Sequence, residues 1–439
     1  MRYPTFRILC ISSLLGAAIH CAPDTSPSDA TPPDASMDRP DGGEQPGVDG
    51  DAATPDAGPS DTCGPLQEFE RKGGTLAASE TWPVGNYLVK GTLYLQGTLT
   101  IQACTVLRLA PEANIIVDTG GALKLLGGET TKVRVTSSNT TPSAGDWGYI
   151  EFRTTSSSGD SEIHHSVIEH GGKGYGAIYV ASGASVAVDH TTIQNSATYG
   201  IEVKSSGHLR GFTDNVITTS GTAPVKIHVN SVGDLLGGTF TGNTFTDNAQ
   251  GHVRAKANVI GQIGAGTYTS GGVNDVIRVD GGTVSKNATW GAWGVPYRID
   301  ATVYVQAPSG TATLTLAAGA KLTMGNGMSF VADTRGVLNL AGTTANHVTV
   351  TSAAAAPVQG IWNYIELRSL GNAFTYADIS YGGGGGNATG YGQLYVSSNS
   401  SVALDNVTFS NGKLCDVDKA NNTNVTVTAT NTTFNECPL

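Results

Sequence analysis

Residues 98 to 138 read "TLTIQACTVLRLAPEANIIVDTGGALKLLGGETTKVRVTSS", and residues 313 to 353 read "TLTLAAGAKLTMGNGMSFVADTRGVLNLAGTTANHVTVTSA". The two stretches align without a gap. The same register reaches "DWGYIEFR" at 146–153 and "IWNYIELR" at 361–368, where five of the eight letters match. Chance agreement over such a length is negligible, so the chain contains an internal duplication.

The duplication extends in both directions. Downstream, "YGAIYVASGASVAVDHTTIQNS" at 175–196 matches "YGQLYVSSNSSVALDNVTFSNG" at 391–412, and upstream the residues near 81–96 match those near 289–306. We therefore divide the folded region into residues 63–288, a first copy followed by a middle segment rich in Asn and Phe, and residues 289–439, the second copy.

Each copy has the pattern of short strands. Runs of four to six residues such as "NIIVD", "VRVTS" and "YIEFR" are β-branched or alternate in polarity, and Gly, Asn, Asp and Ser clusters separate them. No stretch after residue 63 sustains the apolar pattern of a normal helix. In the middle segment, Phe212, Phe240 and Phe245 each precede an asparagine by three residues, which suits inward rings followed by turn asparagines that bond to the adjacent coil.

This pattern resembles the right-handed parallel β-helix family, the pectin-lyase-like solenoids, and within it the glycine-rich kind found in bacterial cell-surface proteins. The lines that carry the resemblance are "TLTL" followed by a glycine, "W-x-Y-I-E" and "I-x-Y-G-G", and they cover roughly residues 75 to 439. The resemblance implies an all-β, right-handed parallel β-helix solenoid. The alternative is a pair of β-sandwich domains, one for each copy.

The N-terminus has the features of an export signal. Arg2 and Arg7 precede an apolar run that ends at Ile19 and is too short to be a permanent membrane span. The sequence "GAAIHC" that follows resembles the lipobox of bacterial lipoproteins, which implies a signal peptide at 1–20 and lipidation of Cys21. His20 departs from the usual small residue of that motif, so ordinary secretion after cleavage by the general signal peptidase is the alternative.

Residues 21–62 form a segment of a different composition. From residue 22 on they contain nine Asp, one Glu, one Arg and eight Pro and hardly any large apolar residue, so they cannot offset their ordering entropy by burial. We expect a disordered acidic tether. It carries −9 of the formal net charge of −11, with +2 in the signal and −4 in the remainder, so the acidity says little about the folded part. No basic patch indicates a nucleic-acid partner.

Four further cysteines lie in two local pairs near the ends of the folded region. An even number of cysteines in an exported chain favours disulfides. Other pairings would require the two ends to meet, so we expect Cys63–Cys104 and Cys415–Cys437. No Cys/His spacing indicates zinc.

The motif shared by "DWGYIEFR" and "IWNYIELR" is the first candidate site. In a strand, Ile150 and Phe152 face the core while Tyr149, Glu151 and Arg153 face outward. A glutamate beside an aromatic ring suggests acid–base chemistry on a sugar, but glycosidases need two carboxylates and the copies share no second acid here. We expect a same-face ion pair, with Trp147, Tyr149, Glu151, Trp362, Tyr364 and Glu366 as ligand-contact candidates rather than catalysts.

The segment "EIHHSVIEHGG" is the second candidate site. His164, Glu169 and His170 could in principle face a metal. The second copy has Tyr376 and Tyr381 in place of His165 and His170, which favours half-buried structural rings, so we predict no metal site.

The aspartates shared by the two copies are interpreted as turn residues. Asp118 and Asp333 each precede a turn, and Asp189 matches Asp405. The resemblance also suggests calcium, because pectate lyases of this fold use it, but no run of carboxylates supports such a site. We expect no cofactor.

Two functions of different classes follow. The first is a non-enzymatic, surface-anchored lipoprotein of the outer membrane or cell surface that touches the membrane only through its lipid and binds a polysaccharide or surface partner. The second is a polysaccharide lyase or glycoside hydrolase, which the family commonly provides, although fold alone is a weak argument for activity. The lack of a defensible acid group favours the first.

Overall fold

The computed structural model describes residues 63–153, 160–221, 223–227, 239–268, 271–272, 274–385, 391–421 and 424–437, all within the compact unit Ala57–Leu439. The expected signal, Cys21 and the acidic segment lie outside these residues. The described part contains 37 strands and one helix, α1 (Ala257–Ile260). The all-β prediction is confirmed.

The strands form three sheets. A 7-stranded sheet contains β2 (Glu80–Trp82), β4 (Thr98–Gln102), β7 (Ala122–Leu126), β10 (Glu162–His164), β13 (Ser185–Asp189), β16 (His208–Thr213) and β19 (Phe240–Thr241). A 6-stranded sheet contains β23 (Gly282–Val284), β26 (Val303–Val305), β29 (Phe330–Ala332), β32 (Ile365–Leu367), β34 (Leu394–Val396) and β36 (Val417–Lys419).

The third sheet has 24 strands. They are β1 (Glu68–Leu76), β3 (Asn86–Leu95), β5 (Val106–Leu109), β6 (Ile115–Val117), β8 (Val133–Ser137), β9 (Ile150–Phe152), β11 (Ser166–Glu169), β12 (Ile178–Val180), β14 (Thr192–Gln194), β15 (Tyr199–Val203), β17 (Val216–Thr218), β18 (Ala223–Ile227), β20 (Thr244–Thr246), β21 (Val253–Ala255), β22 (Ile277–Val279), β24 (Ala288–Trp290), β25 (Tyr297–Ile299), β27 (Ala312–Ala317), β28 (Lys321–Met324), β30 (Gly336–Ala341), β31 (Val348–Ser352), β33 (Asn372–Ser380), β35 (Ser400–Ser410) and β37 (Val425–Thr430).

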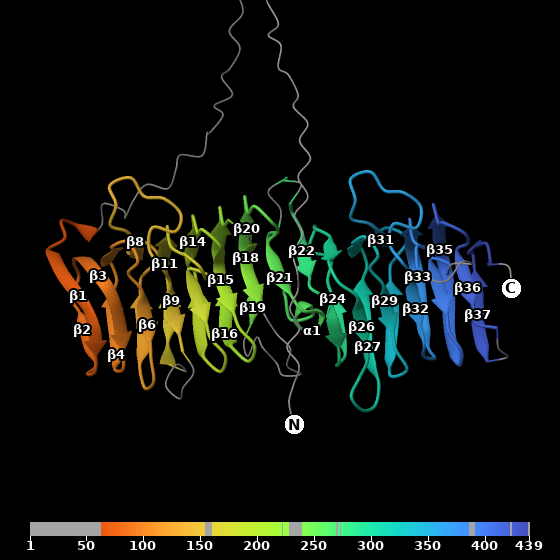
Figure 1. Cartoon of the computed structure of the whole chain (residues 1–439), viewed down its shortest axis with the longest axis horizontal. Helices are drawn as coiled ribbons and strands as arrows, with labels where there is room; N and C mark the ends of the chain where they lie inside the picture. Colours follow the sequence, from red (N-terminus) through yellow and green to blue (C-terminus); the bar gives the residue numbers. More distant parts are fainter. Residues whose placement is uncertain are drawn as a thin grey trace, which may run out of the picture. The chain divides into compact units, whose positions relative to one another are not determined.

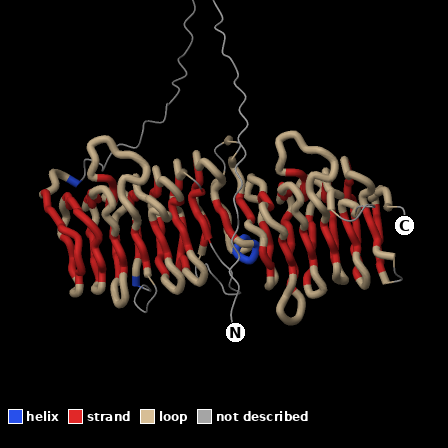
Figure 2. Tube along the Cα trace, viewed as in Figure 1, coloured by secondary structure: helices blue, strands red, loops and turns tan. Residues whose placement is uncertain are grey.

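The pairings between these strands are parallel, and each joins a strand to one on the next circuit of the chain. Thr98 pairs with Ala122 and Ile178 with Ile201, so these circuits take 24 and 23 residues. Figures 1 and 2 show the strands lying side by side from β1 to β37 in curled sheets. Parallel pairing excludes the two antiparallel sandwiches and is compatible with a parallel β-helix-like fold.

The core is built from like residues stacked on successive circuits. Ile115 pairs with Ile150, Ile150 with Ile178, and Ile178 with Ile201, and all four side chains are fully buried. The alternation of the strands explains this, because every second residue of a strand points to the same face. Each circuit therefore buries its apolar face against the two circuits beside it.

The asparagines of the middle segment bond as expected. Asn215 Nδ2 donates to the carbonyl oxygen of Val188 at 3.1 Å and to Asn243 Oδ1 at 3.0 Å, and Asn243 Nδ2 donates to the carbonyl oxygen of Phe212 at 2.8 Å. Both asparagines are fully buried, as is Phe212. The prediction of inward rings followed by asparagines that join neighbouring circuits is confirmed.

The two copies have equivalent strands that do not lie in equivalent sheets. Strand β21 pairs with β22, β22 with β25 and β25 with β28. By the alignment, β28 corresponds to β5, whereas β21 continues the series β6–β9–β12–β15–β18. Strand β9 therefore belongs to the 24-stranded sheet and its counterpart β32 to the 6-stranded sheet.

Two disulfides lie near the ends of the described unit. Cys63 is bonded to Cys104 and Cys415 to Cys437, which confirms both predicted pairings. Disulfides persist in oxidising compartments, so they indicate an exported protein. In the part of the chain that the structure describes, no helix is long and apolar enough to cross a membrane.

Candidate functional site

The strand β9 places the residues of "DWGYIEFR". Ile150 and Phe152 are fully buried, and Glu151 faces outward with its carboxylate 3.2 Å from Arg153 Nε. In β32, Glu366 accepts two hydrogen bonds from Arg368, at 2.7 Å and 2.9 Å. The predicted same-face ion pair is present in both copies.

The tryptophans of this motif are core residues. Trp147 and Trp362 are both 0% exposed. Their indole Nε1 groups donate to the carbonyl oxygens of Glu169 and Ser380, each at 2.8 Å. A buried ring offers no surface to a ligand, so neither tryptophan belongs among the contact candidates, and the expectation for them is corrected.

Tyr149 belongs to a three-tyrosine cluster that sequence reasoning did not single out. Its ring lies edge-on to Tyr175, with centroids 5.2 Å apart and planes at 88°. Tyr175 in turn stacks on Tyr179, with centroids 4.5 Å apart and planes at 30°. Tyr175 is 40% exposed, so the cluster reaches the surface.

The same cluster occurs in the second copy. Tyr364 lies edge-on to Tyr391 at 5.0 Å and 85°, and Tyr391 lies over Tyr395 at 4.3 Å and 30°. The signal in the sequence was the repeated pair "YGAIYV" and "YGQLYV", which supplies two of the three rings each time. We call these two groups the first and second tyrosine clusters.

Carboxylates flank each cluster along its sheet. Tyr179 pairs in register with Glu151 on one side and Glu202 on the other. Likewise, Tyr395 pairs with Glu366 and Asp418. Neighbouring strands lie about 4.8 Å apart, so the two acids of each set stand about 10 Å apart across a tyrosine.

A lysine, Lys204, lies beside the first cluster. Lys204 Nζ lies 3.0 Å from Glu202 Oε1 and within 6 Å of the ring centroids of Tyr175 and Tyr179, at 5.9 Å and 5.8 Å. This is within the range of a cation–π contact. The first cluster therefore combines aromatic faces with both signs of charge.

The hydroxyls of Tyr149, Tyr179, Tyr364 and Tyr395 stay protonated at neutral pH. Burial, followed by the charges of Glu202 and neighbouring groups, raises the pKa of Tyr179 to about 12. Burial likewise raises the pKa of Tyr149, Tyr364 and Tyr395. Each hydroxyl can therefore donate a hydrogen bond as well as accept one.

The histidine segment does not assemble the set considered from the sequence. His164 lies between Asp189 Oδ2, 2.5 Å from its Nδ1, and Glu162 Oε2, 3.1 Å from its Nε2. Glu169 is buried and is held by Arg134, Thr136 and Gln194. His164 and Glu169 thus have separate partners and do not converge on one site.

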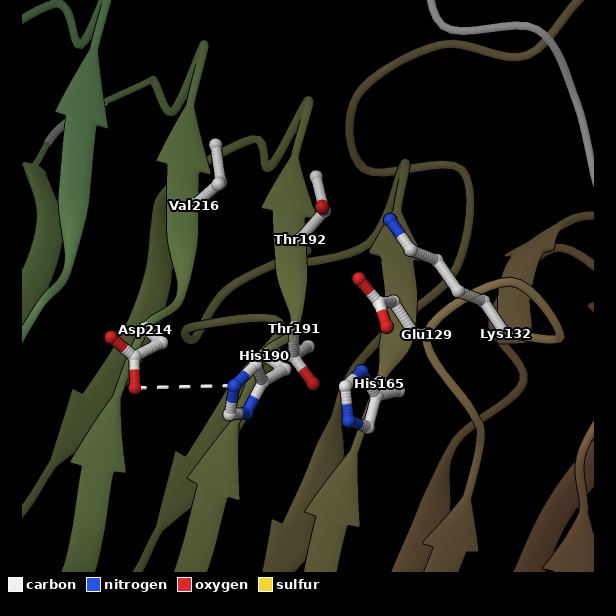
Figure 3. A pocket seen from close by; sticks show the side chains of 8 residues that line it. All are labelled: Glu129, Lys132, His165, His190, Thr191, Thr192, Asp214 and Val216. Carbon is white, nitrogen blue, oxygen red and sulfur yellow. Dashed lines mark ion pairs between the residues drawn. The ribbon is translucent and has the colours of Figure 1, made fainter.

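A different group of three residues does converge. One ligand atom each from His165, Asp189 and His190 can lie within 4.8 Å of the others. The two histidines border an open pocket of about 380 Å³ that is also lined by Glu129 and Asp214 (Figure 3). His165 was interpreted from the sequence as a structural ring, and His190 was not considered.

Two of the shared aspartates, Asp118 and Asp333, have turn roles. The carboxylates of Asp118 and Asp333 accept the backbone N–H of Thr119 and Thr334, at 2.9 Å and 2.7 Å. This confirms the interpretation made from the sequence for this pair. Asp189 differs, because its side chain joins His164 to His190.

Comparison of the chain with protein-family models and with curated proteins found no match.

Proposed function

We propose that the protein is a non-enzymatic, surface-anchored β-solenoid that binds polysaccharide through its two tyrosine clusters. The observation that carries the proposal is the recurrence of the clusters with the same ring geometry, at 5.2 Å and 88° in the first and 5.0 Å and 85° in the second. The proposal includes a right-handed parallel β-helix, which the parallel sheets and the length of each circuit support.

The chemistry of the clusters suits sugars. A sugar ring offers an apolar face of C–H groups and a rim of hydroxyls. Tyrosine supplies a flat apolar face together with a hydroxyl, and the exposed ring of Tyr175 is held by its contact with Tyr149. Glu151 in β9 and Arg153, which directly follows that strand, offer an acceptor and a donor for hydroxyl groups.

Two clusters on one chain imply two binding sites. Because β9 and β32 belong to different sheets, the sites are separate rather than one continuous surface. A polysaccharide or a glycan-covered surface that engages both sites at once would be held more tightly than by either alone. Weak individual sites are therefore sufficient.

The test is titration of the protein with soluble neutral and acidic polysaccharides and their oligosaccharides by calorimetry. We expect two sites for an oligosaccharide of a binding polysaccharide. Tyr175→Ala with Tyr179→Ala should leave one site, Tyr391→Ala with Tyr395→Ala should also leave one, and the fourfold variant should leave none. Tyr304→Ala, which changes an exposed tyrosine outside both clusters, is the control. Full binding by the fourfold variant would overturn the proposal.

Anchoring is supported by the sequence of the N-terminus and by the disulfides. In the proposed protein, Cys21 carries the lipid and residues 22–62 separate it from the folded unit. Labelling of cells with a radioactive fatty acid should mark the wild-type chain and not Cys21→Ala. Label on neither chain would leave secretion as the mode of export, and label on both chains would place the lipid on a residue other than Cys21.

A second candidate function, cleavage of a polysaccharide, is favoured by one observation. Burial raises the pKa of Asp418, partly offset by a hydrogen bond from the backbone of Lys419, whereas Glu366 is held by Arg368. Two carboxyl groups in different environments across Tyr395 are the arrangement of a general acid and a base. Release of new chain ends that is abolished by Asp418→Asn and Glu366→Gln would favour this function, and no release would exclude it for that substrate.

A further inference from the structure

The corner between β10 and β11 recurs on successive circuits and has the same backbone each time. His165, His190 and Asp214 occupy it with φ of 43°, 48° and 55°, in the left-handed region that few side chains favour. In Figure 3 the side chains of these residues follow one another across neighbouring circuits. The corner thus places three ionisable side chains beside one another.

The backbone of the corner does not require these residues. In the second copy the corresponding positions are Tyr376, Asn406 and Asn431, with φ of 45°, 53° and 47°. Tyrosine and asparagine therefore serve the same turn. The histidines and the aspartate of the first copy need an explanation other than the turn.

The side chains are arranged as a set of ligands. The rings of His165 and His190 are stacked with centroids 4.5 Å apart and planes at 27°. Asp189 Oδ1 lies 3.1 Å from His190 Nδ1, and one ligand atom from each of the three residues lies within 4.8 Å of the others. Glu129 and Asp214 line the same open pocket, so further oxygen ligands are close.

We propose that His165, His190 and Asp189 bind a divalent transition metal ion of the zinc, nickel or copper class. Two imidazoles and a carboxylate are donors that these ions prefer, and a fourth position is left to water or to a carboxylate of the pocket. Tetrahedral zinc with bonds of about 2.0 Å needs ligand atoms about 3.3 Å apart. The ligand atoms lie within 4.8 Å of one another, and small rotations of these partly exposed side chains would bring them to about 3.3 Å.

The surrounding groups support this role. The second oxygen of Asp189 accepts from His164 Nδ1, whose other nitrogen faces Glu162. Such outer partners orient a ligating carboxylate. Lys132 also lines the pocket and brings a positive charge to it, so the predicted ion is held chiefly by the two histidines and Asp189.

The second copy supplies variants that fit the fold. His165→Tyr and His190→Asn install the residues that the same corner has at Tyr376 and Asn406. His347→Asn is the matched control, because His347 Nδ1 forms an equivalent pair with Asp378 at 3.0 Å outside the pocket. The full chain should carry no histidine tag. The Asp-rich residues 22–62 are present in every variant, so loose cation binding there is the same for all chains and does not affect the comparison.

The experiment is titration of the chain with Zn²⁺, Ni²⁺ and Cu²⁺ in competition with a chromophoric chelator. We expect one equivalent to bind to the wild type and to His347→Asn, and the affinity to fall at least tenfold in His165→Tyr and in His190→Asn. Absence of stoichiometric binding, or equal binding by all four chains, overturns the proposal.

Discussion

Gly171 lies directly against the indole of Trp147. A Cβ atom built on Gly171 would stand 2.5 Å from Trp147 Cζ2, far inside van der Waals contact. The second copy repeats the relationship, with a Cβ on Gly382 at 2.6 Å from Cζ2 of Trp362. Absence of a side chain at this glycine is therefore a condition for burying the tryptophan.

The first prediction concerns these glycines. Gly171→Ala and Gly382→Ala should each lower the free energy of unfolding by about 1–3 kcal/mol, because a buried indole has little room to move. Urea denaturation followed by tryptophan fluorescence measures the change. Gly211→Ala is the control, since a Cβ there meets nothing within 4 Å. Equal stability of all three variants would contradict the packing argument.

The second prediction concerns the buried asparagines. Asn215 Oδ1 accepts the backbone N–H of Thr191 at 3.0 Å, and its amide donates to Val188 and Asn243. Asn215→Ala leaves buried backbone groups without partners, which should cost about 2–4 kcal/mol. Thermal denaturation compares it with Asn346→Ala, an exposed position where little change is expected. A loss of stability no larger than that of the control would argue against the hydrogen bonds of the buried asparagines as a source of stability.

The third prediction concerns pH. Burial alone would raise the pKa of Glu169, but hydrogen bonds from Gln194 and Thr136 and the charge of Arg134 outweigh it, and the pKa is lowered. A carboxyl whose folded pKa lies below its unfolded value of about 4.3 contributes stability above that pH and loses it as the pH falls through the folded value. The stability gap between wild type and Glu169→Gln should therefore be large at pH 7 and shrink by pH 3. Glu112→Gln, at a carboxylate whose side chain is 71% exposed, is the control. A gap that does not change with pH would refute the assignment.

The fourth prediction concerns the disulfides. Each joins segments near one end of the unit, with sequence separations of 41 and 22 residues. Loss of such a bond typically costs about 2–5 kcal/mol. Because each circuit contacts only its neighbours, hydrogen exchange should rise near β1 to β4 in Cys63→Ser with Cys104→Ser, and near β35 to β37 in Cys415→Ser with Cys437→Ser. A rise spread evenly along the chain in either variant would show that the unit unfolds as a whole.

Most of the fold could be read from local sequence. The alternation in "YIEFR" placed Ile150 and Phe152 in the core and Glu151 beside Arg153, because side chains alternate along any strand. The gapless repeat predicted equivalent strands in both copies, and the positions of the cysteines predicted both bonds. These features depend on residues that are close along the chain or on the sequence match between the two copies.

Other features depended on contacts between circuits. Trp147 was expected at the surface. Its ring is buried because it packs against Gly171 and its Nε1 group donates a hydrogen bond to the carbonyl oxygen of Glu169. The tyrosine clusters join residues up to 31 positions apart, and the sequence alone does not say which rings of two circuits meet.

The periodicity and the inward residues could be predicted from the sequence because they follow from strand geometry and local turn chemistry, and the duplication because the two stretches match letter by letter. The grouping of His165, Asp189 and His190, and the placement of equivalent clusters in different sheets, became visible in the three-dimensional fold alone. The reason is register. Which residues share a corner depends on the length of every circuit between them. The irregular circuit around α1 pairs β21 with β22, and β22 pairs with β25, so the strand series of the first copy continues into strands of the second copy that are not its equivalents.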